Sequence, residues 1–228
     1  MVLDARAQVE ESVLIPAGEA DLTGILSLPQ NPCGVVLVAE DQSVNPFSGR
    51  RERLAARLRT AGLGTLTIDL LSKDEAALHR PAKAVVSLMA ERLLEATRWI
   101  RALHYGLPVG YLGAGAAGAA ALEAASQAPH LIEAVVCLSE LPVISRDILE
   151  EVKSPTLWLL GADYPGQHQA CRAAFDQLEC AKAMELVPGA GPLFDEGSTL
   201  DRAANAARHW FVRHLAGIGT HRWRKVKR

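Results

Sequence analysis

The sequence predicts an α/β fold in which a mostly parallel sheet carries helices on both of its faces. From residue 34 to residue 215, short apolar runs alternate with longer amphipathic segments, the pattern of parallel strands joined by helices. The run 34–39 is apolar throughout, as expected for a strand that is covered on both faces. Ahead of it, two strand-like segments flank a turn at 16–20 and predict an antiparallel hairpin.

The first half of the chain supplies the hairpin and two buried strands. The hairpin strands are 8–15 and 22–28, and the strand at 34–39 is followed by a polar loop at 40–49. Residues 50–61 place Leu54, Leu58 and Ala61 on one helical face. A second buried strand is expected at 65–70, a charged loop at 72–83 and a long amphipathic helix at 85–103.

The second half repeats the strand and helix alternation. Three pairs are expected, at 109–112 with 114–128, at 132–138 with 145–151 and at 156–160 with 168–178, before a last strand at 184–187 and a last helix at 199–215. The sequence contains neither an internal repeat nor a linker between domains. It therefore predicts one domain over 1–218 and a basic C-terminal tail over 219–228.

Composition excludes several classes of protein. The 228 residues are 49% hydrophobic and 22% charged, with a net charge of -2, which argues against a protein built mainly to bind nucleic acid. The sequence shows neither a secretion signal nor an apolar stretch of the ~20 residues that span a bilayer, so a cytoplasmic location is expected. The four cysteines form no CxxC pair and have no histidine at zinc-binding spacing, so neither a metal nor a cofactor is expected.

The most informative segment is 109–118, which reads Val-Gly-Tyr-Leu-Gly-Ala-Gly-Ala-Ala-Gly. It predicts a strand that enters a tight glycine turn and then a helix. Gly115 falls at the tip of this turn, and a shift of one residue would place Ala116 there. Either residue offers only backbone and methyl groups, so the turn lacks a nucleophilic side chain.

Most of the chain resembles the dienelactone hydrolase-like branch of the α/β-hydrolases, and in particular its small cytoplasmic members that are sometimes joined to phosphoribosyltransferase domains. The resemblance depends on six segments in the family's order: 34–39, 61–71, 90–99, 107–114, 187–190 and 209–215. It implies an α/β-hydrolase fold with its substrate cleft at the carboxyl edge of the sheet.

The resemblance also implies catalytic parts that this chain lacks. A hydrolase of this family needs a nucleophile, a base, an orienting acid and donors for the oxyanion. The family's nucleophile turn reads like Gly-Ala-Ser-Thr-Gly, whereas residues 113–117 place Gly115 at the serine position. The family's histidine position holds Pro192 here, and its oxyanion-loop His-Gly is replaced by Glu40 and Asp41. A carboxylate at that loop would repel an oxyanion.

Four other residues are candidates for the missing catalytic parts. Asp163 follows the strand at 156–160 and is either a remnant of the orienting acid or a residue that caps a helix and orders the loop. Cys137 and Ser139 end the preceding strand and are candidates for a displaced nucleophile. His168 is the one histidine near a suitable strand end.

The same turn also spells Gly113-x-Gly115-x-x-Gly118, the fingerprint of dinucleotide-binding proteins. Glu140 follows at about the spacing of a ribose-binding carboxylate. Helix amides near Ala114 and Ala116 would then hold a phosphate. Alternatively, the small residues allow a helix to pack closely on the sheet without any ligand.

Acidic residues are expected at the carboxyl edge of the sheet. They are Glu40, Asp41, Asp69, Glu140, Asp163, Asp195 and Glu196. We expect either an acidic pocket for a cationic or polyhydroxy ligand or ordinary solvated carboxylates and helix caps. Pocket candidates are thus Glu40, Asp41, the turn residues 113–116, Glu140, Asp163 and Pro192.

The basic tail has three possible roles. It would contact an acidic partner, RNA or a membrane surface, or it would cover the acidic edge of its own subunit or of a neighbouring subunit in a homodimer. Alternatively, it extends into solvent.

Three functions follow, in order of preference. The first is a non-catalytic α/β-hydrolase-fold protein that binds a small molecule or a protein partner. The second is an ester hydrolase with an unconventional nucleophile such as Cys137 or Ser139. The third is a nucleotide-binding protein that uses the glycine turn. The sequence identifies neither the ligand nor the partner.

Overall fold

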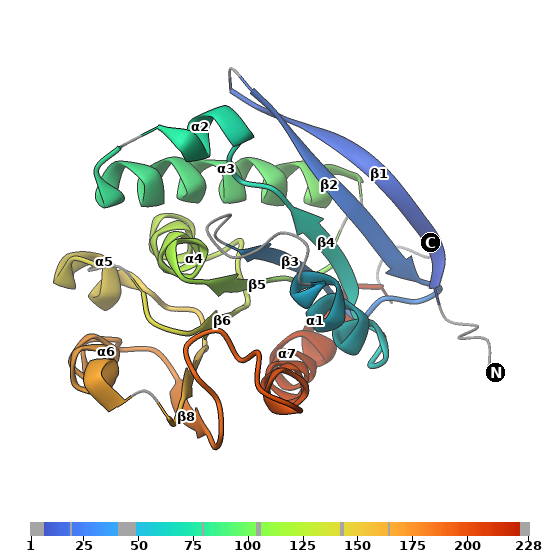
Figure 1. The fold of residues 1–228 in the computed structure, drawn as a ribbon. Coiled ribbons are helices and arrows are strands. Elements are labelled where there is room, and N and C mark those ends of the chain that lie inside the picture. The colour runs from blue at the N-terminus through green and yellow to red at the C-terminus, as the bar shows by residue number, and fades with distance from the viewer. Residues whose placement is uncertain are drawn as a thin grey trace.

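The computed structural model describes residues 7–18, 20–40, 49–78, 80–103, 106–141, 144–163 and 165–223. Eight strands form one sheet in the order β1-β2-β4-β3-β5-β6-β7-β8 (Figure 1). The strands are β1 (Ala7–Ala17), β2 (Ala20–Pro29), β3 (Val35–Glu40), β4 (Gly64–Ile68), β5 (Val109–Ala114), β6 (Ala134–Leu138), β7 (Thr156–Gly161) and β8 (Lys182–Val187). Strands β3 to β8 are parallel, whereas β1 pairs antiparallel with β2 and β2 antiparallel with β4. The predicted fold class is confirmed.

Helices cover both faces of this sheet. They are α1 (Arg50–Arg59), α2 (Lys73–Ala77), α3 (Ala82–Leu103), α4 (Ala116–Gln127), α5 (Arg146–Glu151), α6 (His168–Asp176) and α7 (Thr199–Trp223). Helices α1 and α7 contact each other on one face, whereas α3 and α4 pack together on the other face (Figure 1). A single-turn helix at Pro165–Gln167 precedes α6.

Strand β3 explains why the sheet has a core on each side. Val36 and Val38 pack into the apolar cluster beneath α1 and α7, and Val35 and Leu37 pack into the cluster beneath α3 and α4. All four side chains are fully buried. Because side chains alternate between the faces of a strand, a strand buried on both faces must be apolar throughout, as its sequence predicts.

Two elements differ from the sequence-based prediction. Residues 72–83 were expected to form a loop, but α2 begins inside them. Ser72 caps this helix and Glu75 returns a hydrogen bond to the Ser72 amide, a capping box that stabilises even a short helix. The last helix does not end at residue 215 but continues to Trp223. The proposed boundary at 218/219 therefore falls inside α7, and a separate role for the tail stays a prediction.

The parallel strands all end at one edge of the sheet, and the β1–β2 turn reaches the same edge because Gly24 of β2 pairs with Ile68 at the end of β4. This carboxyl edge is where ligand sites occur in open α/β sheets.

Among the described residues, every helix is too short or too polar to cross a membrane. The cytoplasmic location stays a prediction.

Candidate functional site at the carboxyl edge of the sheet

The glycine turn between β5 and α4 has a backbone conformation that glycine adopts freely but that would strain a residue with a side chain. Gly115 has φ 57° and ψ -128°, a combination that side chains disfavour and that clusters at functional turns. Its amide donates to the Leu138 carbonyl at 3.3 Å, and its own carbonyl accepts from the amides of Gly118 and Ala119 at 3.0 and 3.2 Å. The turn therefore has the sharp strand-to-helix geometry that exposes a nucleophile in α/β-hydrolases, but its tip residue is a glycine.

The two flanking glycines are required by packing. A Cβ atom at Gly113 would lie 2.5 Å from the Ala117 carbonyl oxygen, and one at Gly118 would lie 2.6 Å from a Leu141 methyl carbon and 3.0 Å from the Gly113 carbonyl oxygen. All three distances are shorter than a van der Waals contact. Close packing of α4 against β5 therefore accounts for the outer glycines of the dinucleotide-like pattern without a bound nucleotide.

The structure brings Pro192 and Asp163 to the same edge as Gly115. Pro192 lies in the loop between β8 and α7, and its carbonyl accepts a hydrogen bond from the Ser139 hydroxyl at the end of β6. The Asp163 amide donates to the Ala190 carbonyl at 3.1 Å, so the loops after β7 and β8 are in contact. Pro192 is exposed, and so is Asp163. The positions that the resemblance assigned to nucleophile, base and acid are thus carried by adjacent loops.

Neither replacement nucleophile has the surroundings of a reactive group. The Cys137 side chain is fully buried beneath α4, 3.8 Å from the Gly118 carbonyl oxygen. Burial raises the pKa of the Cys137 thiol well above its ordinary value, which disfavours the reactive thiolate. Ser139 has a positive φ of 66°, and its own carbonyl accepts from the Trp158 indole at 2.9 Å. In the described part of the chain, the hydroxyl of Ser139 is bonded to a carbonyl and not to an imidazole.

Glu140 and His168 lie close enough for His168 to influence the pKa of the Glu140 carboxyl, a proximity that the sequence alone did not predict. His168 begins α6, and its Nε2 lies 2.8 Å from the Gly161 carbonyl oxygen. Partial burial raises the pKa of the Glu140 carboxyl, while the charge of His168 opposes that shift. The available signal was that both residues follow the carboxyl ends of neighbouring strands, β6 and β7.

The described acidic residues at this edge are partly paired and partly exposed to solvent. Asp69 pairs with Arg51 at 2.5 Å, and Asp195 and Glu196 are exposed. Asp41 and the side chain of Glu40 lie outside the described residues, so the acidic pocket stays a prediction. In the portion of the chain that the structure describes, acidic, histidine and cysteine side chains form no group able to hold a metal ion.

Arg50 is a structural determinant of this edge that the sequence reasoning missed. It is only 2% exposed, and its Nη1 donates to the Leu193 carbonyl at 2.7 Å. The guanidinium also lies over the Phe194 ring, 5.9 Å from the ring centre. Arg50 thus attaches the start of α1 to the loop that carries Pro192. As the first residue of an amphipathic helix, it gave no sequence signal of burial.

The sheet order, the two helical layers and the sharp turn after β5 define an α/β-hydrolase fold. Dienelactone hydrolase from Anabaena variabilis is 34% identical, with a TM-score of 0.85 over 92% of this chain and 99% of that one. The chain belongs to the dienelactone hydrolase family. Est1E from Butyrivibrio proteoclasticus shares the fold at 14% identity, with a TM-score of 0.74 over 90% of this chain and 99% of Est1E.

A putative phosphoribosyl transferase of Mycobacterium tuberculosis is also similar, at 34% identity over 212 residues. The match takes in 92% of this chain but 48% of that protein. The chain therefore spans about half the length of the curated relatives that it matches. No family model matches the sequence.

Proposed function

We propose that this protein is a non-catalytic member of its family that binds a small molecule or a protein partner at the carboxyl edge of its sheet. One observation carries the proposal: the sharp turn that presents a nucleophile in α/β-hydrolases has Gly115 at its tip. Acyl transfer begins with attack by a side-chain atom, and a glycine has none.

The neighbouring residues support the same proposal. The position that the family resemblance assigns to the base holds Pro192, whose ring has no nitrogen able to accept a proton. Cys137 is fully buried beneath α4, and the Ser139 hydroxyl is bonded to the Pro192 carbonyl. These contacts argue against the alternative of a hydrolase with a displaced nucleophile.

The name of the mycobacterial relatives does not lead us to propose transferase activity for this chain. The matched half of those proteins corresponds to a chain with a dienelactone hydrolase fold over nearly its whole length. We propose instead that any phosphoribosyl transfer in the relatives belongs to the part of their length that this chain does not span.

The proposal is tested by chemical labelling combined with an assay of ester hydrolysis. The wild-type protein is incubated with a fluorophosphonate probe and with iodoacetamide, and a panel of activated esters and lactones is followed for turnover. We expect no fluorophosphonate adduct and no turnover above the buffer rate. An adduct at one residue, with loss of a measurable turnover, would establish the displaced-nucleophile alternative.

A gain-of-function pair tests whether the turn itself limits the chemistry. Gly115→Ser combined with Pro192→His restores a hydroxyl and an imidazole to the two adjacent loops, and Gly115→Ala with Pro192→His is the matched control that lacks the hydroxyl. We expect fluorophosphonate labelling of the serine variant at position 115 and none of the alanine variant. Equal labelling of both variants would show that the reactive group lies elsewhere.

A further inference from the structure

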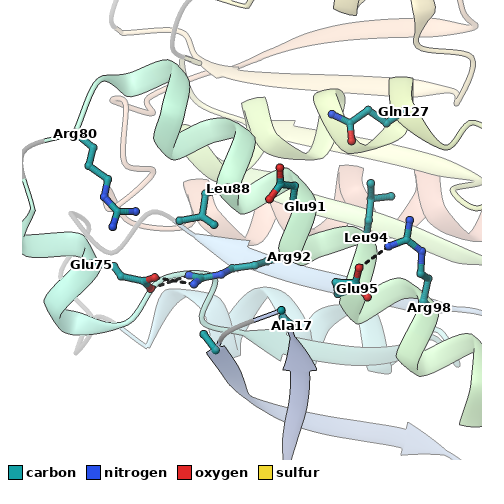
Figure 2. Close-up of a pocket in the computed structure, with 12 residues that line it drawn as sticks. Ala17, Glu75, Arg80, Leu88, Glu91, Arg92, Leu94, Glu95, Arg98 and Gln127 are labelled. Atoms are coloured by element: carbon teal, nitrogen blue, oxygen red, sulfur yellow. Dashed lines mark hydrogen bonds and ion pairs between the residues drawn. The ribbon is translucent and has the colours of Figure 1, made fainter.

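A cavity lies away from the glycine turn, between the β1–β2 hairpin turn and helix α3 (Figure 2). It is a groove of about 680 Å³, a volume within the range of sites for small molecules. The hairpin turn and α2 form its walls, and the outward face of α3 forms its floor. Among the described residues, its lining includes neither the glycine turn nor Ser139, Asp163 or Pro192, so the groove is distinct from that turn, although the hairpin turn lies at the same edge of the sheet.

The floor of the groove contains a buried arginine with an unsatisfied donor. Arg92 is 6% exposed. Its guanidinium donates to the Leu70 carbonyl at 2.7 Å and to both carboxylate oxygens of Glu75, each at 2.7 Å (Figure 2). Its Nε is buried and has no hydrogen-bond partner among the described residues. A buried donor left unpaired is unfavourable, and this atom has essentially no surface exposed to the groove.

These contacts also hold the groove open in a defined shape. Glu75 belongs to the capping box of α2, so its bidentate bond with Arg92 attaches that helix to α3. A wall that is already ordered loses little conformational freedom when a ligand binds.

Two of the charged side chains that line the groove, one positive and one negative, have no ion-pair partner among the described residues. Arg92 pairs with Glu75, and Arg98 pairs with Glu95 at 2.6 Å. Among the described residues, Arg80 and Glu91 have no such ion pair. In Figure 2 they lie on either side of Leu88. The apolar Leu88 and the buried Leu94 line the groove between and beside these charges.

We propose that this groove binds a zwitterionic molecule with an apolar body, of the class of short peptides with free termini. The ligand carboxylate would contact Arg80 and its ammonium group Glu91, and apolar side chains would cover Leu88 and Leu94. Because the lining carries three arginines and three glutamates, it favours neither a purely anionic nor a purely cationic ligand.

The probe for this proposal is the dipeptide leucyl-leucine, titrated into ¹⁵N-labelled wild-type protein. We expect saturable shifts of the amide signals of residues 17–20 and 88–98. The expected Kd is about 0.2 mM, the value that a typical binding free energy per non-hydrogen atom predicts for a dipeptide of this size. N-acetyl-leucyl-leucine and leucyl-leucine amide each lose one terminal charge and should bind about tenfold more weakly. Equal binding of a blocked dipeptide, or no saturation at 10 mM, would overturn the proposal.

Two variants locate the binding without disturbing the core. Arg80→Gln and Glu91→Gln remove the uncompensated charges, and both side chains are exposed, so the fold should be retained. Each should weaken leucyl-leucine binding about tenfold. The controls Arg172→Gln and Glu185→Gln alter exposed residues outside the groove and should leave the Kd unchanged. Unchanged binding in both groove variants, or equal loss in the controls, would overturn the assignment. The binding of leucyl-leucine is measured without any assay of ester hydrolysis, so a failure of this proposal can be distinguished from a failure of the proposed function.

Discussion

The hydroxyl of Ser139 donates a hydrogen bond to the main-chain carbonyl of Pro192, across 53 residues of sequence. This contact joins the end of β6 to the loop between β8 and α7. Ser139 adopts a positive φ to make it. At the position that the family resemblance assigns to the base, the loop is thus held by a structural hydrogen bond.

Removing that hydroxyl should lower stability. Ser139→Ala loses the hydrogen bond and keeps the unfavourable positive φ, so we expect a loss of about 1 kcal/mol in the free energy of unfolding. Ser139→Gly loses the same bond but relieves the backbone strain, and it should therefore be more stable than the alanine variant. Urea denaturation measures both. An alanine variant as stable as wild type would mean that the bond contributes nothing.

Arg50 should contribute much more than its exposed neighbours on α1. Arg50→Ala removes a charged donor to the Leu193 carbonyl and the contact with the Phe194 ring, and we expect a loss of about 2 kcal/mol. Arg53 is the control, because its ion pair with Asp201 at 3.6 Å is half exposed, and Arg53→Ala should change stability by less than about 0.5 kcal/mol. Equal losses in the two variants would contradict a special role for Arg50.

Gly113→Ala tests whether packing accounts for the glycine pattern. The new methyl group would meet the Ala117 carbonyl oxygen at 2.5 Å, and overpacking of this kind destabilises by about 1–3 kcal/mol. Gly166 has open space around it and no positive φ, so Gly166→Ala should be neutral or slightly stabilising. Thermal unfolding compares the two. A neutral Gly113→Ala would remove the packing explanation.

The ion pair between Glu75 and Arg92 should make stability depend on pH in the acid range. The hydrogen bond from the Arg92 guanidinium lowers the pKa of the Glu75 carboxyl from 4.5 to about 2. A depressed pKa stabilises the folded state above the unfolded pKa, and this contribution is lost as the pH falls from about 4.5 towards 2. The difference in unfolding free energy between wild type and Glu75→Gln should therefore shrink over that interval. A constant difference from pH 5 to pH 2 would contradict the pairing.

The four free cysteines should react in two groups with iodoacetamide. Cys33 and Cys180 are partly exposed, whereas Cys137 and Cys171 are buried. Burial raises the pKa of the Cys33 thiol as well as those of Cys137 and Cys171, so exposure, and not the pKa, separates the two groups. Mass spectrometry of the native protein should therefore find the first two labelled well before the others. Rapid labelling of Cys137 would instead favour it as a displaced nucleophile.

The order of strands and helices could be predicted from the chain alone because burial leaves a local signature. Residues 34–39 are apolar at every position, and the segment 85–103 has its apolar residues at helical spacing. Each pattern depends only on which faces of that strand or helix are buried. The short helix α2 was missed because its capping box stabilises only five residues, too few to produce a recognisable apolar period.

The amino-acid sequence by itself determined the fold class and the residue at the tip of the turn after β5, since glycine carries no reactive atom in any conformation. Only the tertiary structure decided which groups surround that tip. Contacts such as Ser139 with Pro192, Arg50 with Leu193, and Arg92 with Glu75 join residues far apart in the chain. Their partners depend on how the strands are ordered in the sheet, and no local pattern of residues encodes that order.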